Sequence, residues 1–112
     1  MSPAYQRGEG YWIQLDPARG HEQSKTRPCV FVSDTLIILR RGTVVVLPLT
    51  TTPQPAHPPL LMATPSMGAG SKAHTEHIRA VDKSRLGRLQ GSLSEPDLEA
   101  LGRAISKVLK LS

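Results

Sequence analysis

The residues best suited to chemistry lie in a polar loop that runs directly into an apolar strand. The stretch GHEQSKTRPCVFV, residues 20–32, enters that strand through Arg27 and the proline after it. A planar guanidinium beside a rigid proline suits bidentate contact with a phosphate. The carboxylate of Glu22 could take a proton if its pKa were raised, and the imidazole of His21 titrates near neutral pH. Alternatively, Glu22 reads a base edge or pairs with Lys25.

A second polar group lies in HTEHIR, residues 74–79. If this segment is a strand, His74 and Glu76 share one face, and His74 either contacts a nucleic acid or is merely solvated. The basic residues from here onward would neutralise phosphates and give salt-sensitive affinity. They are Arg79, Lys83, Arg85 and Arg88. Alternatively, part of this stretch is structural, and Asp82 pairs with Arg85 in a compact turn that maintains the fold.

Composition narrows the class of protein. Lysine and arginine number 14 against 9 acidic residues, a formal charge of +5, which favours a polyanionic partner, although a soluble basic surface has the same balance. No apolar run reaches the roughly 18 residues that span a bilayer. The N-terminus lacks a hydrophobic signal segment. We therefore expect a cytoplasmic protein without a membrane partner.

The cysteine and histidine residues argue against a disulfide framework, a cysteine nucleophile and a metal site. The single cysteine, Cys29, sits in an apolar run, which excludes a disulfide framework and favours a buried structural thiol over a nucleophile. The histidines and acids show no close ligand spacing beyond His74, Glu76 and His77, and short clusters of this kind are usually incidental. We expect neither a metal nor another cofactor.

The first half of the chain predicts three strands. Residues 11–16 follow a period close to two, and residues 27–33 and 43–50 are rich in β-formers. Residues 18–26 lack periodicity and predict an exposed loop. The proline near the start of the second strand places that end at a sheet edge or a bulge. Residues 34–42 fit either a short helix or a further extended segment.

The second half predicts a long connection, one strand and a helix. Residues 51–73 hold five prolines and two glycines, which predicts a mobile connection interrupted by an edge strand at 59–62. Residues 74–81 predict another strand, and residues 82–89 a basic turn. Ser94 then caps an amphipathic helix. Its apolar face holds Leu98, Leu101, Ile105, Val108 and Leu109.

The length and the element order together predict a fold class. A chain of 112 residues fits one compact domain with one core, because two cores would each be marginal. Many short strands followed by one helix predict a mainly β fold with a C-terminal helix, arranged as a small, partly open barrel.

The order of the segments resembles the MazF/PemK family of toxin endoribonucleases. The matching blocks are RGE with YWIQLDP, GHEQSKTRP, VVVLPLTTTP, IRAVDKSRLGRL and the terminal helix. They cover nearly the full length, and residues 53–75 are the weakest part. The resemblance implies an SH3-like barrel of the MazF, Kid and CcdB toxin type, a single toxin domain over residues 1–112, a homodimer, and a cognate acidic antitoxin.

The resemblance also implies a reaction. Such toxins cut single-stranded RNA, including mRNA, at specific sequences and without a metal. The ribose 2′-hydroxyl attacks the adjacent phosphate, which leaves a 2′,3′-cyclic phosphate and a 5′-hydroxyl. Because the nucleophile belongs to the RNA, DNA is not cut.

Three matched residues are expected to be catalytic, namely Arg27, Thr50 and Glu22. Arg27 would stabilise the phosphorane charge first and donate a proton to the leaving oxygen second, because a guanidinium hardly deprotonates. A structural pair with an acid is the alternative. The Thr50 hydroxyl would donate to a phosphate oxygen, although Thr51 or Thr52 could hold that place. The residues expected to contact RNA are His21, Gln23, Ser24, Lys25, Glu76, His77, Arg79 and Arg85.

The sequence departs from the family pattern at EHIR, where DQIR or EQIR is usual. His77 replaces the glutamine, which alters the hydrogen bonds offered to a base, so the cleavage sequence cannot be taken from relatives. Gly10 stands where an aliphatic residue is common. The loop at residues 19–26 is expected to be a mobile cover over the site, on which the antitoxin acts.

Two other function classes remain open. The same barrel serves toxins that poison DNA gyrase by binding, but these would not need Arg27, Thr50 and the polar HEQ loop together. A non-catalytic nucleic-acid-binding module is the other alternative. Such a module stacks bases on aromatic rings, and this chain has only Tyr5, Tyr11, Trp12 and Phe31.

Overall fold

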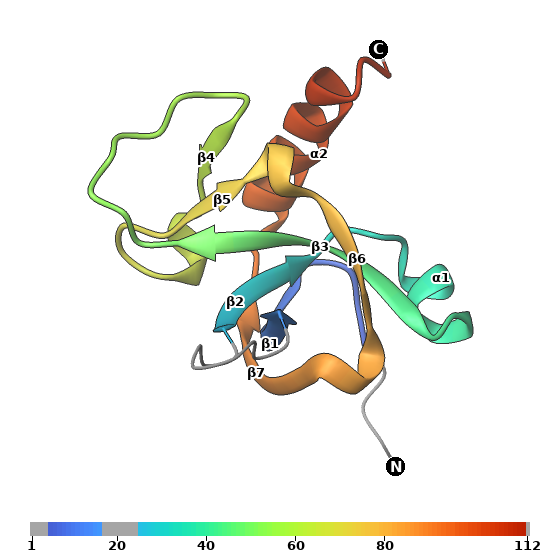
Figure 1. The fold of residues 1–112 in the computed structure, drawn as a ribbon. Coiled ribbons are helices and arrows are strands. Elements are labelled where there is room, and N and C mark those ends of the chain that lie inside the picture. Colours follow the sequence, from blue (N-terminus) through green and yellow to red (C-terminus); the bar gives the residue numbers. More distant parts are fainter. Residues whose placement is uncertain (1–4, 17–24, 112) are drawn as a thin grey trace.

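The computed structural model describes residues 5–16 and 25–111, in which antiparallel strands and a long terminal helix dominate (Figure 1). The strands are β1 (Glu9–Asp16), β2 (Lys25–Phe31), β3 (Thr43–Thr50), β4 (Leu61–Ala63), β5 (Lys72–His74), β6 (Arg79–Asp82) and β7 (Leu86–Ser92). The α-helices are α1 (Thr35–Arg40) and α2 (Glu95–Val108), and short 3₁₀ helices are η1 (Pro65–Met67), η2 (Thr75–His77) and η3 (Lys83–Arg85).

The strands form one bent sheet that stays open. Its order is β4-β5-β3-β2-β1-β7, and β6 pairs with β3 beside this path. Strand β3 organises the sheet, because residues 43–46 pair with β6 and residues 49–50 pair with β5. Figure 1 shows β3 crossing the molecule from β6 toward β5, with α2 lying beyond β5. The prediction of a mainly β, partly open fold with a C-terminal helix is confirmed.

Apolar side chains pack on both faces of the central strands. Phe31 and Val46 belong to one buried cluster, whereas Val30 and Leu47 belong to a second cluster that includes Leu101 of α2. Adjacent residues of a strand point to opposite faces, so neighbouring positions enter different clusters. The same alternation decides which polar side chains share a face at the strand ends.

Strand β3 matches the predicted segment, whereas β1 and β2 each begin two residues earlier than predicted. Lys25 and Thr26, expected in the loop, are the first residues of β2 and pair with the end of β1. The loop prediction was wrong there, because a partner strand supplies main-chain hydrogen bonds that the local sequence does not reveal. Pro28 pairs with β1, but the pairing of β2 with β3 begins at Cys29. The proline therefore lies where β2 is an edge, as predicted.

The ambiguous segment 34–42 contains the short helix α1. The carboxylate of Asp34 caps it by accepting a hydrogen bond from the backbone N–H of Leu36 at 3.0 Å. Ile38 is buried, while Leu36 is 62% exposed.

Residues 51–81 differ from the prediction in two ways. The edge strand is confirmed as β4, at the end of the sheet, but the connection also contains η1 and the start of β5. Residues 74–81 are not one strand, because η2 separates β5 from β6. Thr75 is fully buried there, and its N–H donates to the carbonyl of Leu60 at 3.1 Å, which anchors the bend. His74 and Glu76 are therefore not two positions apart on a strand.

The basic turn is shorter than predicted. The carboxylate of Asp82 caps the start of η3 by accepting a hydrogen bond from the backbone N–H of Ser84 at 2.8 Å. From Leu86 onward the chain is strand β7, paired with β1, so the prediction of a turn through residue 89 was wrong. The reason is again a partner strand distant in sequence.

Helix α2 begins as predicted. The Ser94 hydroxyl accepts from the N–H of Asp97 at 3.3 Å, and Leu101 is fully buried. Leu109, predicted on the apolar face, is the C-cap and is 47% exposed, so the sheet does not cover that end of the face. In the described ranges no helix is long and apolar enough to cross a membrane.

Candidate functional site

Arg27 and Thr50 lie on neighbouring strands at the same end of the sheet. Cys29 of β2 pairs with Pro48 of β3. Continuing this antiparallel register by two residues sets Arg27 opposite Thr50, and directly opposed residues point to the same face of a sheet. Two residues far apart in the sequence are thus brought together by strand pairing.

Both residues line one hollow of about 360 Å³. Trp12 contributes a ring that is 38% exposed, and Gln90 contributes a side-chain amide. The other lining residues are Pro28, Leu49, Thr51, Met67, Gly68, Ala69 and Ser71. The hollow therefore combines an apolar wall and an aromatic ring with hydrogen-bonding groups and a guanidinium. This combination suits a nucleobase and the phosphate attached to it.

The Thr50 hydroxyl is held in place by its own backbone turn. Its Oγ1 accepts a hydrogen bond from the N–H of Thr52 at 3.2 Å. A hydroxyl that accepts in this way keeps its own proton available to donate. Thr51 also lines the hollow, but Thr50 is the residue that the register sets opposite Arg27.

Arg27 is exposed, and it forms no ion pair with any acidic side chain that the structure describes, a set that leaves out Asp16 and Glu22. Its charge acts on Cys29 in its own strand and on His74 in β5, since it lowers the pKa of both groups. For Cys29 the larger effect is burial, which raises the pKa of the thiol to about 12. The prediction of a buried thiol is confirmed, because Cys29 is fully buried and forms no disulfide.

His74 and His77 form a stacked pair at the end of β5. Their ring centroids are 4.7 Å apart, with 16° between the planes. Burial lowers the pKa of His74 most, followed by the charges of His77 and Arg27, while Glu76 opposes them. Glu76 and His77 are both exposed on η2. The fold therefore brings His74, from the polar segment 74–79, within reach of the charge of Arg27.

Arg79 and Arg85 reach the backbone of β1 instead of standing free. Arg79 Nη2 donates to the carbonyl of Leu15 at 3.3 Å, and Arg85 Nη1 donates to the carbonyls of Gln14 and Leu15 at 3.2 and 3.4 Å. These bonds fix the end of β1, directly before the polar loop. Arg85 also lowers the pKa of Asp82, although the main cause is the hydrogen bonding of Ser84.

Part of the predicted site lies outside the described residues. These positions are His21, Glu22, Gln23 and Ser24. Lys25 opens β2, but its side chain also lies outside the description. The catalytic and RNA-binding roles predicted for these residues therefore stay predictions.

Sequence reasoning missed the residues that shape the hollow, chiefly Trp12, Met67 and Gln90. They belong to three separated segments, and β1–β7 pairing and η1 bring them together. One signal was available in the sequence. Tyr11, Ile13 and Leu15 alternate along the first strand, so a strand that buries them turns the ring of Trp12 to the other face.

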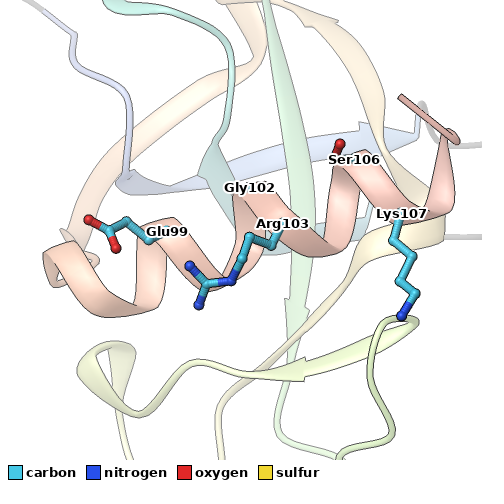
Figure 2. A pocket seen from close by; sticks show the side chains of 5 residues that line it. All are labelled: Glu99, Gly102, Arg103, Ser106 and Lys107. Atoms are coloured by element: carbon cyan, nitrogen blue, oxygen red, sulfur yellow. The ribbon is translucent and has the colours of Figure 1, made fainter. Parts of the chain in front are cut away.

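A second hollow, of about 630 Å³, lies along α2 (Figure 2). It is lined by Glu99, Gly102, Arg103, Ser106 and Lys107, so none of the residues predicted from the sequence contributes to it. Arg103 and Lys107 also border a neighbouring hollow with Pro58, Pro59 and Met62. All five residues that line the hollow of about 630 Å³ belong to α2, and it has no aromatic ring such as Trp12 gives the hollow beside Arg27.

Comparison with known proteins gives the same fold and one family. A curated relative, endoribonuclease MazF9 from Mycobacterium tuberculosis (strain ATCC 25618 / H37Rv), is 37% identical over 113 residues, which cover 94% of this chain and 96% of the relative. The crystal structure of MazE-MazF (Form-II) from Deinococcus radiodurans matches with a TM-score of 0.83 and 21% identity, over 99% of this chain and 100% of that one.

A second solved structure, an endoribonuclease in complex with its cognate antitoxin from Mycobacterial species, matches with a TM-score of 0.78 and 22% identity, over 99% of this chain and 98% of that one. The family model that describes the PemK-like, MazF-like toxin of type II toxin-antitoxin systems matches residues 6–109, nearly the whole described sequence. The chain therefore belongs to the PemK-like, MazF-like toxin family of type II toxin-antitoxin systems.

Proposed function

We propose that this chain is an endoribonuclease toxin that cuts single-stranded RNA at a short fixed sequence. The observation that carries the proposal is the placement of Arg27 and Thr50 on one sheet face, both lining a hollow that also holds Trp12 and Gln90. Membership of the MazF-like family and the endoribonuclease at 37% identity support the same reaction class.

The proposed reaction is an internal transfer at the phosphate. The 2′-oxygen loses its proton and forms a bond to phosphorus, the bond to the 5′-oxygen breaks, and the 5′-oxygen leaves with a proton. Arg27 stabilises the charge that grows on the phosphoryl oxygens, and Thr50 donates a hydrogen bond to one of them. The products are a 2′,3′-cyclic phosphate and a 5′-hydroxyl, and no metal takes part. Glu22 remains a proposed catalytic residue of the loop.

We also propose that the hollow reads the base next to the cut. Trp12 offers a stacking surface, and Gln90 offers both a donor and an acceptor to a base edge. His21, Gln23, Ser24, Lys25, Glu76 and His77 are the further proposed RNA contacts. For Arg79 and Arg85, the bonds to β1 favour a supporting role.

The proposed partners are a second copy of the chain and an acidic antitoxin, with action in the cytoplasm. A Mycobacterial relative was solved with its cognate antitoxin, and the formal charge of this chain is +5. A basic site that holds RNA also suits an acidic segment that folds on binding. The relatives reported above carry MazF or endoribonuclease names, which favours the nuclease over the gyrase-binding alternative.

Cleavage of a long single-stranded RNA in excess EDTA by antitoxin-free protein tests this proposal. We expect cuts at one short sequence with 5′-hydroxyl ends, and none with Arg27→Ala. Arg40→Ala is the matched control, since Arg40 is an exposed arginine of α1 outside the hollow, and it should cut at the wild-type sequence. Folded wild-type protein that cuts no RNA, or cuts only after a metal is added, would refute the proposal.

A further inference from the structure

The proposed reaction needs a group that takes the 2′-hydroxyl proton, and neither Arg27 nor Thr50 suits that task. A guanidinium is already protonated at any relevant pH, and a threonine hydroxyl is a poor base. An imidazole is the side chain whose ordinary pKa lies nearest to neutral pH. Glu22 and His21 lie outside the described residues, and among the histidines that the structure describes it associates His74 with Arg27.

Strand register puts His74 on the face that carries Arg27 and Thr50. Thr50 pairs with Lys72 of β5, and Leu49 pairs with Ala73. His74 is two residues beyond Lys72 and therefore points to the same face as Thr50. Strands β2 and β5 flank β3, so their backbones are separated by roughly 10 Å, or two interstrand spacings. Two long side chains can converge across that distance on one nucleotide.

The electrostatics agree with this placement. Arg27 lies close enough to His74 for its charge to lower the pKa of the imidazole. Trp12 pairs with Pro28, whereas Ile13 pairs with Arg27. By the same alternation, His74 shares the sheet face of Arg27 and Trp12 does not.

The ring of His74 is held before substrate arrives. Its backbone pairs with Leu61 of β4, its side chain is half-buried, and its ring stacks on His77 with centroids 4.7 Å apart. Fixed orientation of this kind is what a catalytic base requires. His77, the other ring of the pair, is exposed on η2.

We propose that His74 is the general base that removes the proton from the ribose 2′-hydroxyl. This inference rests on the proposed endoribonuclease function. An imidazole nitrogen of neutral His74 takes the proton, the 2′-oxygen bonds to phosphorus, and the bond to the 5′-oxygen breaks. The 5′-oxygen takes a proton from water, and the imidazolium then releases its proton to solvent.

The charged and titratable groups facing His74 determine how the rate depends on pH. They are His77 and Glu76 on η2, Arg27 on β2, and His57 before β4. Burial, His77 and Arg27 lower the pKa of His74 from its ordinary value near 6.5. The ring is therefore mainly neutral at pH 7, as a base must be, and activity should fall as the pH drops below 6.5 and the ring becomes protonated.

Single-turnover cleavage between about pH 5 and pH 9 tests the inference, with His74→Gln, His77→Gln and His57→Gln. We expect His74→Gln to lose about 100-fold to 10,000-fold in rate and to lose the acid limb of the profile, while binding of a 2′-deoxy substrate is kept. His77→Gln should move the acid limb to higher pH, because a charge that lowers the pKa of His74 is gone. His57→Gln removes the smallest of the charges that act on His74, so it should keep the wild-type rate at neutral pH and move the acid limb less than His77→Gln does.

A His74→Gln variant that keeps the wild-type rate, or that slows but retains the acid limb, would overturn the inference and leave the proposed function intact. Absence of cleavage by the wild type would instead refute the proposed function. If His74→Gln does not fold, an NMR titration of the wild-type histidines decides the matter. The pKa of the His74 ring must then equal the pKa of the acid limb, and a mismatch would refute the role of base.

Discussion

At the scale of single residues, the site depends on a hydroxyl and a guanidinium set opposite one another. The Oγ1 of Thr50 accepts from the N–H of Thr52, so its proton is free for a phosphate oxygen. Thr50→Val keeps the β-branched shape but removes the donor. We expect kcat to fall by about 100-fold to 1,000-fold, as for the loss of one oxyanion donor, with a smaller change in KM.

The control for this prediction is Thr50→Ser, which keeps the hydroxyl and should stay within about 10-fold of the wild-type rate. Rapid-quench cleavage assays on an RNA oligonucleotide measure both variants. Wild-type kcat in Thr50→Val would show that the hydroxyl does not contact the reacting phosphate.

Arg27 and Thr50 could be predicted because each lies in a block that matches the family, TRP for Arg27 and LPLT for Thr50. The sequence could not predict Trp12, Met67 and Gln90 as one wall, since their proximity depends on β1–β7 pairing and on the position of η1. Nor could the sequence show that the charge of Arg27 lowers the pKa of His74, because this effect depends on the pairing of β5 with β3.

At the scale of elements, β7 lies close against β1 at Gly87. A Cβ on Gly87 would stand 2.9 Å from the carbonyl oxygen of Trp12, which is backbone and cannot rotate away. Gly87→Ala should therefore push the strands apart, cost about 1–3 kcal/mol, and shift Trp12 beside the hollow. A Cβ on Gly42 would meet nothing within 4 Å, so Gly42→Ala is the matched control.

Thermal unfolding and Trp12 fluorescence, the single tryptophan, measure these two variants. We expect a lower Tm and an altered emission for Gly87→Ala alone. Equal Tm values for the two variants would mean that β7 does not pack on β1 at this distance.

Leu101 of helix α2 is fully buried and belongs to the same apolar cluster as Val30 of β2 and Leu47 of β3. Leu101→Ala should lower the free energy of unfolding by about 2–5 kcal/mol, because it leaves a cavity. Leu109→Ala, at the exposed C-cap, should change it by less than about 0.5 kcal/mol. Urea unfolding compares the two, and equal losses would contradict the boundary of the buried face.

Element types were predictable where the pattern was long and local, as in β3 and α2. The failures share one cause. Lys25, Thr26 and residues 86–89 became strand because β1 pairs with both segments, and residues 74–81 were split because Thr75 is buried and bonded to Leu60. Each outcome depends on a partner distant in the sequence.

At the scale of the whole molecule, a formal charge of +5 should make RNA binding strongly dependent on salt. The logarithm of the affinity should fall linearly with the logarithm of the salt concentration, by about 0.7 per phosphate contacted on a single strand. Arg27→Gln should reduce that slope by about 0.7. Fluorescence anisotropy on a 2′-deoxy analogue measures binding without cleavage, and an unchanged slope would mean that Arg27 contacts no phosphate.

The most direct measurement compares two oligonucleotides that differ by one atom. One is the RNA that contains the mapped cleavage sequence, and the other replaces only the ribose 5′ to the cut by 2′-deoxyribose. In EDTA, we expect a 2′,3′-cyclic phosphate and a 5′-hydroxyl from the first oligonucleotide, and tight binding without cleavage for the second. Cleavage of the deoxy-substituted strand, or a 5′-phosphate on the product, would contradict attack by the 2′-hydroxyl.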